Sequence, residues 1–556
     1  MRREEQIGDA GPMAEAAESP QPGAVRAAPR ASEPWWKHAV IYQVYPRSFQ
    51  DSNGDGVGDL AGVIQRLDYL VDLGVDALWL SPFYRSPMAD FGYDVRDHVS
   101  IDPIFGDMAD FRALVRACRE RGLKVILDYI PNHTSDQHLW FAESRSNRTN
   151  PRRDWFIWRD AAPDGGPPNN WRSEFGGSAW TWDPAREQYY YHAFLSCQPD
   201  LNWRCPDVVE AMLNVMRFWL DRGIDGFRVD AIHHLMERGD LSDNPSNPLW
   251  REGMDPADQL LRSATVDQPD VHGAVTAMRR VLDDYPGDVV LIGEAYLPLD
   301  RLVTYYGAPN DGFHLPFNFH LIVTPWTPTA VAALVAAYER QLPDHGWPNW
   351  VLSNHDRSRL VSRIGAPQAK VAAMLLLTLR GTPTLYQGDE LGMADVAIAP
   401  DEVQDPLELN VPGLGLGRDP ARTPMLWSPD PQAGFTTGAP WLPLSPDWRQ
   451  INVEQQAAAP DSVLNFYRSL LALRRGQPAL QLGDYAQVSA DETLLAYERR
   501  LGDDRLLIVL NMTDAPATIL APSGQIILST HGQPPEPHQA GPLRMAPHQG
   551  LILRSA

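Results

Sequence analysis

The sequence predicts an α/β fold: a (β/α)8 TIM barrel with a loop-rich subdomain inserted after its third strand, followed by a C-terminal antiparallel β-sandwich domain. From residue 35 onward, short apolar runs alternate with amphipathic segments, which is the pattern of repeated βα units around a parallel sheet. Eight such runs occur, the number that a closed barrel of this kind needs. After residue 475 the helical periodicity gives way to short alternating segments, which are typical of an antiparallel sheet.

The elements of the predicted barrel follow one another in a regular order. The apolar runs predict strands at 39–45, 77–81, 124–129, 226–230, 289–294, 313–319, 350–354 and 383–387. Between several of these runs the apolar positions recur with the helical period. This periodicity predicts helices at 60–73, 108–121, 206–221 and 368–379.

Three further segments complete the predicted organisation. Residues 131–203 are dense in Asn, Pro, Gly and Trp, and we expect them to form an inserted subdomain B between the barrel segments 35–130 and 204–475. Alternating runs at 493–499, 505–510 and 525–530 predict a C-terminal β domain over 476–556. Residues 1–34 are rich in Ala, Pro, Gly and Glu without periodicity, which predicts a disordered leader.

Composition and charge limit the classes of partner. The chain of 556 residues carries 48 basic and 71 acidic residues, a formal net charge of −23. This excess of negative charge opposes a nucleic acid and favours a small neutral ligand. No apolar stretch reaches the length of a membrane span, and no apolar h-region follows Arg2 and Arg3. We therefore expect a cytoplasmic monomer or homodimer without a membrane partner.

Polar side chains follow four of the predicted strands at the point where each ends. The fourth strand ends in Arg228 and Asp230, which share a face because side chains two apart on a strand point the same way. The third strand runs through Asp128 towards His133, the fifth ends at Glu294, and the seventh is followed by His355 and Asp356. Since catalytic residues of such barrels sit at the C-terminal ends of strands, this accumulation predicts one shared active site.

The residue types in this predicted site indicate the chemistry. Three carboxylates with an arginine and two histidines, in a chain without a triad serine or a dinucleotide-binding loop, suit reaction at an acetal carbon. One carboxylate attacks and another protonates the leaving oxygen. In a retaining glycosidase the two carboxyl groups lie about 5 to 5.5 Å apart, and a covalent glycosyl intermediate forms. Arg228 beside Asp230 supplies the counter-charge that keeps a nucleophile ionised.

Several motifs occur in a fixed order along the chain: IYQVYPRSF at 41–49, GYD at 92–94, DYIPNH at 128–133, GFRVD at 226–230, GEA at 293–295, NHD at 354–356 and RTPM at 422–425. Together they resemble glycoside hydrolase family 13, the α-amylase family. The resemblance implies that Asp230 is the nucleophile, Glu294 the general acid and base, and Asp356 the carboxylate that holds the sugar hydroxyls. It further implies that no organic cofactor is needed, and it implies substrate-binding roles for Asp90, Tyr93, His133, Arg228, Ala231, His355 and Arg422.

Two shorter features concern the branch of the family. QPDLN at 198–202 resembles the signature of the oligo-1,6-glucosidase and α-glucosidase branch, which implies exo-action on short chains. In that branch Val directly after the nucleophile tends to accompany α-1,6 specificity, whereas Ala or Thr accompanies α-1,4 specificity, and here the residue is Ala231. The resemblance thus implies a retaining exo-acting α-glucosidase that releases α-glucose from the non-reducing end of maltose-like α-1,4 substrates through a covalent glucosyl-Asp230 intermediate.

Other activities remain as alternatives. An oligo-1,6-glucosidase acting on isomaltose-type links, and a transglucosylating or sucrose-acting enzyme of the same branch, use the same covalent intermediate. A non-catalytic relative of the transporter heavy-chain type fits less well, because such proteins have a membrane span and degraded catalytic residues.

The segment DSNGDGVGD predicts a structural metal site. Asp51, Asn53, Asp55, Val57 and Asp59 fall at alternate positions, as at the start of a calcium-binding loop. An EF-hand is excluded, because its twelfth position, which needs a bidentate Glu, is Gly62. In the resembled branch a similar loop holds Ca2+ or Mg2+, and the alternative is an ordinary Asx-rich turn.

Overall fold

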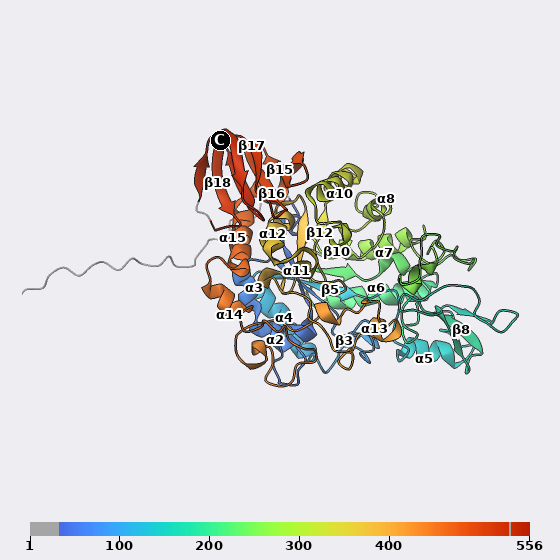
Figure 1. Cartoon of the computed structure of the whole chain (residues 1–556). Coiled ribbons are helices and arrows are strands. Elements are labelled where there is room, and N and C mark those ends of the chain that lie inside the picture. The colour runs from blue at the N-terminus through green and yellow to red at the C-terminus, as the bar shows by residue number, and fades with distance from the viewer. Residues whose placement is uncertain (1–32, 533–534) are drawn as a thin grey trace, which may run out of the picture. The chain divides into compact units, whose positions relative to one another are not determined.

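A computed structural model describes residues 33–532 and 535–556, so the leader expected at 1–34 lies outside the described residues except for its last two. Eight parallel strands form one sheet in the order β11-β10-β9-β5-β2-β1-β13-β12, and a parallel bridge between Asn318 and Trp350 joins its two edges. The sheet is the predicted (β/α)8 barrel (Figure 1). Its strands are β1 (Ile41–Val44), β2 (Ala77–Leu80), β5 (Lys124–Tyr129), β9 (Gly226–Val229), β10 (Val290–Gly293), β11 (Leu315–Pro316), β12 (Asn349–Val351) and β13 (Thr382–Tyr386).

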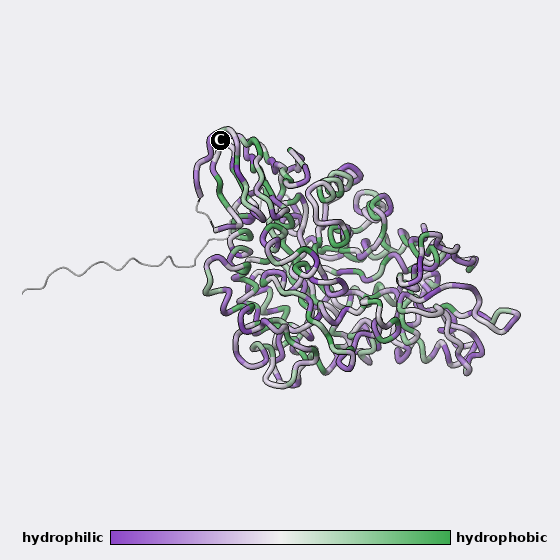
Figure 2. Tube along the Cα trace, in the orientation of Figure 1, coloured by the Kyte–Doolittle hydropathy of each residue, from purple (hydrophilic) through white to green (hydrophobic). Residues whose placement is uncertain are grey.

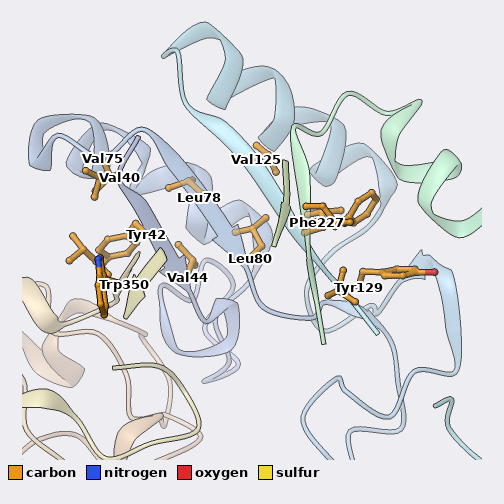
Figure 3. Packing of buried hydrophobic residues seen from close by; sticks show 14 of the residues in the cluster. Val40, Tyr42, Val44, Val75, Leu78, Leu80, Val125, Tyr129, Phe227 and Trp350 are labelled. Atoms are coloured by element: carbon orange, nitrogen blue, oxygen red, sulfur yellow. The ribbon is translucent and has the colours of Figure 1, made fainter. Parts of the chain in front are cut away.

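Side chains on the two faces of these strands belong to two separate hydrophobic cores. Tyr42, Leu78 and Phe227 belong to the larger core, which packs the barrel strands against the surrounding helices (Figure 3). Residues of the other parity, such as Trp79 and Ile126, form a smaller core inside the barrel. In Figure 2 hydrophobic segments follow the strands, and hydrophilic colouring predominates in the outer loops. Every second residue of a strand points into the barrel, and this alternation continues to the C-terminal strand ends. The inward-facing positions just beyond the apolar layer are therefore occupied by polar residues predicted for the active site, such as Asp128, Arg228 and Asp230.

The barrel helices begin and end where local sequence provides caps. Asp107 and Asp110 form a capping box at the start of α4, and Asp59 accepts the Gly62 N–H at the start of α2. The helix expected at 60–73 is two helices, because the chain leaves helical geometry at Arg66. The helices that follow barrel strands or precede the C-terminal domain are α2 (Leu60–Gln65), α3 (Leu67–Leu73), α4 (Met108–Glu120), α6 (Pro206–Leu220), α7 (Val271–Asp283), α10 (Pro328–Gln341), α12 (Ala369–Thr378) and α15 (Val463–Gly476).

The remaining short elements lie in connections. Short helices are α1 (Trp35–His38), α5 (Leu139–Ser146), α8 (Leu299–Leu302), α9 (His320–Val323), α11 (Leu360–Ile364), α13 (Pro406–Asn410), α14 (Val453–Ala458) and α16 (Pro478–Leu482). The long excursion between β5 and α6 contains α5 and a three-stranded antiparallel sheet of β6 (Trp158–Arg159), β7 (Trp180–Asp183) and β8 (Gln188–Tyr191), and β3 (Tyr84–Arg85) pairs with β4 (Asp97–Ile101) after β2. In the described part of the chain no helix is both long and apolar enough to cross a membrane.

The C-terminal domain consists of two antiparallel sheets packed on a shared core that includes Leu507, Leu543 and Leu553. The larger sheet, in the order β14-β15-β16-β21-β18-β19, contains β14 (Asp484–Ala490), β15 (Leu494–Leu501), β16 (Asp504–Asn511), β18 (Gly524–Ser529), β19 (Glu536–His538) and β21 (Gly550–Ser555). The smaller pairs β17 (Ala517–Ala521) with β20 (Gly541–Met545). Buried Arg499 donates to the carbonyls of Thr378 and Gly483, which anchors this domain to the end of α12.

Candidate active site

Arg228 is the residue around which the predicted catalytic carboxylates gather. β9 places its guanidinium, fully buried, inside the barrel. Its Nη1 donates to Asp128 Oδ1 at 2.6 Å and to Asp230 Oδ1 at 2.8 Å, and its Nη2 lies 2.7 Å from Glu294 Oε2. These groups come from neighbouring strands, because the register places Arg228 beside Asp128 on β5 and beside Ile292 on β10. One cation therefore holds three carboxyl groups within reach of one another.

Burial and mutual repulsion raise the pKa of Asp128 and Asp230. Burial raises the pKa of Asp128 to about 6 against the opposing charge of Arg228. Burial likewise raises the pKa of Asp230 well above its usual value, opposed by Arg228 and reinforced by the charges of Glu294 and Asp128. Because groups this close titrate together, the cluster keeps a proton at a pH where isolated carboxyl groups have lost theirs. The cluster can therefore offer an ionised carboxylate and a carboxylic acid at the same time.

The two oxygens of Glu294 have different surroundings. Oε2 accepts the Ala231 N–H at 2.9 Å in addition to its contact with Arg228. Ala231 can direct its N–H there because it adopts the left-handed conformation, with φ 44° and ψ 36°, immediately after β9 and Asp230. Since donors engage Oε2, a proton carried by Glu294 is favoured on Oε1, and the side chain borders the cavity described below.

Asp356 is held by two arginines and by His355. Arg422 Nη2 donates to Asp356 Oδ1 at 2.9 Å, His355 Nε2 lies 3.4 Å from Oδ2, and Arg418 Nη1 lies 3.6 Å from Oδ1. Burial alone raises the pKa of Asp356, but His355, Arg422 and Arg418 outweigh it and hold the pKa well below its usual range. Asp356 is therefore ionised at neutral pH.

A chain of hydrogen bonds fixes the orientation of His355. Gln43 Nε2 donates to His355 Nδ1 at 2.8 Å, which leaves the ring proton on Nε2. That Nε2 lies 2.8 Å from Tyr93 Oη, which in turn donates to Asp128 Oδ2 at 3.0 Å. The Tyr93 and His355 rings stack with centroids 5.4 Å apart. Burial lowers the pKa of His355 well below its usual value, so its imidazole is neutral.

One end of the site is closed by a buried ion-pair network. Arg418 Nη2 lies 2.7 Å from Asp90 Oδ1 and 2.6 Å from Asp405 Oδ1, and Gln198 Nε2 donates to Asp90 Oδ2 at 3.1 Å. Asp90 is only 4 % exposed. We call Asp90, Tyr93, Asp356 and Arg418 the closed end.

A cavity of about 730 Å³ connects these groups. Of the predicted site residues, those that line it are Asp90, Tyr93, His133, Asp230, Ala231, Glu294 and Asp356. Arg228, His355 and Arg422 lie behind its wall and contact the carboxylates from there. The structure thus brings all ten predicted catalytic and substrate-binding residues to one site.

Several lining residues escaped the sequence analysis. They include Glu174, Phe175, Phe194, His233, His234, Arg262, Tyr296, Arg357 and Arg418. A signal was available for five of them. His233 and His234 closely follow the fourth strand end, Tyr296 and Arg357 follow Glu294 and Asp356 by two residues and one, and Arg418 precedes Arg422 by four. Glu174, Phe175 and Phe194 lie in the β5–α6 excursion and Arg262 in the β9–α7 connection, where no periodicity marks them.

A succession of rings begins beside the closed end, where His133 Nε2 lies 3.1 Å from the Tyr93 carbonyl oxygen, and continues along the wall. His133 and Phe194 lie 5.2 Å apart, Phe194 and His234 5.2 Å, His234 and His233 4.4 Å, and His233 and Tyr296 6.5 Å, all between ring centroids. Burial lowers the pKa of His133 to about 3 and that of His233 to about 4, so these imidazoles are neutral. We call this arc, together with Glu174 and Arg262 on the same wall, the open side.

The predicted metal loop lies between β1 and α2, away from the cavity lining. Its oxygens accept backbone N–H groups: Asp51 Oδ1 from Asn53 and Gly54, Asn53 Oδ1 from Asp55, and Asp55 Oδ1 from Val57. Among the residues that the structure describes, no group of three or more His, Cys, Asp or Glu side chains is arranged to hold a metal ion. The oxygen-rich donor set suits a hard cation, but its hydrogen bonds are also those of an Asx-turn loop.

Comparison with known proteins defines the class of this protein. A family model described as "Alpha amylase, catalytic domain" matches residues 43–483, and one described as "Domain of unknown function (DUF3459)" matches residues 482–552. The first match spans most of the chain. The chain therefore belongs to the α-amylase family of glycoside hydrolases, and it is an enzyme of that family.

Individual relatives are similar over nearly their whole length. A probable alpha-glucosidase of Rhizobium meliloti (strain 1021) is 43% identical over 87% of this chain and 90% of the relative. An oligo-1,6-glucosidase of Parageobacillus thermoglucosidasius is 35% identical over 94% of this chain and 99% of the relative. Among solved structures, an alpha-glucosyl transfer enzyme, XgtA, superimposes with a TM-score of 0.90 at 42% identity over 94% of this chain and 100% of that chain.

Proposed function

We propose that this chain is a retaining exo-acting α-glucosidase that releases α-glucose from the non-reducing end of short α-glucosides and prefers α-1,4 links. The observation that carries the proposal is the contact of one buried guanidinium, Arg228, with both Asp230 and Glu294. Two carboxyl groups on one cation are close together, as a retaining mechanism needs and an inverting mechanism does not.

In the first step Asp230 attacks the anomeric carbon, the glycosidic bond breaks, and Glu294 donates its proton to the leaving oxygen. In the second step Glu294 accepts a proton from water while that water attacks the same carbon. The bond to Asp230 breaks and α-glucose leaves with the original configuration. Asp356, kept ionised by Arg422 and Arg418, accepts hydrogen bonds from the sugar hydroxyls and stabilises the positive charge that develops on the ring.

The closed end supports exo-action. Asp90 and Arg418 are paired and buried where a sugar chain would have to continue beyond the glucosyl unit. Asp90, Arg418 and Asp230 line the same cavity, so the hydroxyls of a terminal glucosyl unit bound there can exchange hydrogen bonds with the two paired charged groups. His133 and Tyr93 border the same unit.

The central test is Asp230→Asn, which keeps the shape of the side chain and removes the nucleophile. We expect maltose hydrolysis to fall about 10⁴- to 10⁶-fold, as when the nucleophile of a covalent mechanism is removed. Product analysis of the unaltered enzyme on maltose, isomaltose, sucrose and trehalose fixes the linkage and the acceptor together. Near-normal turnover by Asp230→Asn, or initial release of β-glucose, contradicts the proposal.

Transglucosylation is the second candidate. It shares the covalent intermediate and delivers it to a sugar or alcohol in place of water. Similarity to an alpha-glucosyl transfer enzyme at 42% identity supports it, and so does the ring-lined open side, from which a bulky acceptor can displace water. The ratio of transfer products to free glucose at high maltose concentration distinguishes the two outcomes. An oligo-1,6-glucosidase remains the alternative for linkage, and the isomaltose arm tests it.

We also propose that the loop holds a structural Ca2+ or Mg2+ through Asp51, Asn53, Asp55, Val57 and Asp59. Support comes from the spacing of hard oxygen donors, which suits such an ion. Replacing Asp51 and Asp55 together by Asn is expected to remove the bound metal and to lower Tm by several degrees, because a ligand of the folded state stabilises it. Metal analysis of the purified protein gives the first readout, and unchanged metal content and Tm contradict the site.

The division of the chain, its location and its assembly are further proposals. We propose the boundaries 35–130 and 204–475 for the barrel, 131–203 for subdomain B and 476–556 for the C-terminal domain. We propose a cytoplasmic monomer or homodimer, and the unpaired thiols of Cys118, Cys197 and Cys205 support a reducing compartment. Light scattering on the purified chain and fractionation of the source cells test these assignments.

A further inference from the structure

A buried glutamine lies against the Nδ1 edge of the His355 ring. Gln43 is on β1, where the register places it beside Trp79 on β2 and Tyr386 on β13, and its side chain is fully buried. Its Nε2 donates to His355 Nδ1 at 2.8 Å and to Ser81 Oγ at 3.1 Å. Gln43 does not line the cavity, so it can act on a bound sugar only through other residues.

The remaining contacts of His355 hold its ring in place. The rings of Tyr45 and Tyr93 stack on it with centroids 5.6 and 5.4 Å away, and Trp79 meets it edge-on at 6.2 Å. The His355 carbonyl accepts the Arg422 Nε–H at 2.8 Å. With the ring held in this way, the property left to be fixed is which of its two nitrogens carries the proton.

The charged groups around His355 favour one proton, and they favour it on Nε2. Burial lowers the pKa of His355 well below its usual value, and Asp356 opposes this shift. Three cations add to the shift, those of Arg422, Arg228 and Arg418. The ring is therefore neutral and has a single proton. Asp356 Oδ2 lies 3.4 Å from Nε2, so a proton on Nδ1 would leave a lone pair facing this carboxylate.

The proton on Nε2 also sets the direction of a longer chain of hydrogen bonds. His355 Nε2 lies 2.8 Å from Tyr93 Oη, which donates to Asp128 Oδ2 at 3.0 Å. Because a hydroxyl has one hydrogen, Tyr93 can satisfy both neighbours only when His355 donates and Asp128 accepts. Asp128 in turn accepts from Arg228, the cation shared by the catalytic carboxyl groups. The donor that Gln43 presents to Nδ1 is thus the first in a chain that ends at this cluster.

We propose that Gln43 is a positioning residue for catalysis. Its amide keeps the His355 proton on Nε2, so that His355 donates towards Asp356 and Tyr93, and Tyr93 remains the donor to Asp128. The inference rests on the proposed α-glucosidase activity. It assigns to Gln43 no contact with the substrate and no part in proton transfer to it.

Two replacements of Gln43 have different expected effects. Gln43→Met keeps the length of the side chain and removes the donor, so the proton is no longer held on one nitrogen of His355. We expect kcat/KM on maltose to fall about 10- to 100-fold, the size of loss when a buried polar group is left without its partner. The loss should appear chiefly in kcat, because Asp356 stabilises charge that develops in the transition state.

Gln43→Glu keeps the shape of the side chain but presents an acceptor to His355 Nδ1. The new carboxylate raises the pKa of His355, because it favours a proton between the two groups. Below that raised pKa, Nδ1 is engaged and Nε2 keeps its proton. Above it one proton is lost, and the one that stays is drawn to Nδ1. We therefore expect the pH profile of kcat/KM to gain a descending alkaline limb that neither the unaltered enzyme nor Gln43→Met shows.

The protonated nitrogen can also be observed directly. The ring 15N chemical shifts of His355 distinguish a nitrogen that carries a proton from one that does not, and the signals are assigned by their loss in His355→Gln. We expect a proton on Nε2 and none on Nδ1 in the unaltered enzyme at neutral pH. In Gln43→Met we expect a mixture of the two forms.

Gln387 provides the matched control. It is a second fully buried glutamine, directly after β13, and its N–H donates to the Gln43 carbonyl at 3.1 Å. Its side chain accepts the Tyr45 N–H and donates to the Ser48 carbonyl. Gln387→Met and Gln387→Glu are expected to lower Tm, as the loss of a buried hydrogen bond does, and to leave the His355 proton and the shape of the pH profile unchanged.

A proton on Nδ1 of His355 in the unaltered enzyme overturns the positioning role. So does a folded Gln43→Glu without the alkaline limb, or an equal fall of kcat/KM in Gln43→Met and Gln387→Met. These results leave the α-glucosidase activity in place. If neither Gln43 variant folds, the 15N shifts of the unaltered enzyme decide, and a proton on Nε2 supports the inference. If the unaltered enzyme releases no α-glucose from maltose, the proposed function fails, and the inference fails with it.

Discussion

The closed end and the open side of the cavity differ in the interactions that hold their side chains in place. At the closed end, Asp90 and Asp356 are paired with Arg418 and Arg422 by contacts of 2.7 to 3.6 Å, and nearly all of these groups are buried. On the open side the wall contains several neutral rings, and its ion pair between Glu174 and Arg262 is partly exposed. One part of the cavity is therefore lined by buried ion pairs, and another part is lined mainly by uncharged rings.

This difference indicates which part of the cavity tolerates amino-acid substitutions. Removing one partner of a buried ion pair leaves an uncompensated charge, and such losses are large. Rings that pack at 4.4 to 6.5 Å between centroids can be exchanged with smaller cost, because no charge is left unpaired. We expect the closed end to fix which sugar unit is accepted, and the open side to set what it is joined to.

The largest effect is expected from breaking the closed end. Arg418→Met removes the cation shared by Asp90, Asp405 and Asp356 and leaves those carboxylates without it. We expect kcat/KM on maltose to fall about 10²- to 10³-fold, the size of loss for truncating one partner of a buried charge pair. The control is Arg145→Met, which breaks the pair with Asp183 outside the cavity and should change kcat/KM by less than about twofold. A loss below tenfold in Arg418→Met contradicts the difference drawn between the two ends.

A smaller effect is expected at Ala231, which stands between the two ends. Ala231→Val places a larger side chain in the cavity wall beside the leaving group. The ratio of kcat/KM for isomaltose to kcat/KM for maltose should rise by about 10-fold or more, within the 10- to 200-fold that a methylene-scale change can give. Ala231 has φ 44°, a conformation that strains β-branched residues, so both Val and Thr are expected to lower Tm.

Ala231→Thr is therefore the matched control. It has the same branching and nearly the same volume as the Val variant, but the resemblance implies that Thr accompanies α-1,4 specificity. Its linkage ratio should stay near that of the unaltered enzyme. If Thr and Val shift the ratio equally, the linkage preference follows from bulk or strain at this position and not from the kind of side chain.

How much of this could be predicted from the sequence depends on the type of element. Strand ends of the barrel were predictable, because period-two burial and the position of Asp128, Arg228 and Glu294 after apolar runs place them on one rim. The predicted strand cores agree with β1, β2, β5, β9, β10 and β13 to within two residues at each end. The family and the presence of a C-terminal antiparallel sandwich were likewise confirmed.

Loop-borne features were not predictable for a physical reason. Glu174 and Arg262 are separated by 88 positions in the sequence. They meet where the side chains of Trp171 and Asn170 donate to backbone carbonyls of the β9–α7 connection and so join two irregular segments. No periodicity or turn signal encodes such a contact. The division of 60–73 into two helices also escaped prediction, since both halves keep their apolar face on either side of Arg66.

The smallest expected effect concerns the pH dependence of kcat/KM, which the carboxyl groups around Arg228 are expected to set. Burial and the charges of Glu294 and Asp128 raise the pKa of Asp230, whereas at the closed end cations hold the pKa of Asp356 low. Asp230 must be ionised to attack, so kcat/KM should fall as pH drops through the raised pKa. Asp128→Asn removes one negative neighbour and leaves more of the Arg228 charge for Asp230, which lowers the pKa of Asp230.

The acid limb of the pH profile in Asp128→Asn is therefore expected to move to lower pH by about one unit, equivalent to about 1.4 kcal/mol of altered interaction. Asp183→Asn, which removes a buried carboxylate outside the cavity, should leave the limb where it is. A limb that stays in place in Asp128→Asn, or moves to higher pH, means that burial and not charge repulsion governs the nucleophile. In that case, exclusion of water alone would explain the raised pKa of Asp230, and neighbouring charges would control the pKa only at the closed end.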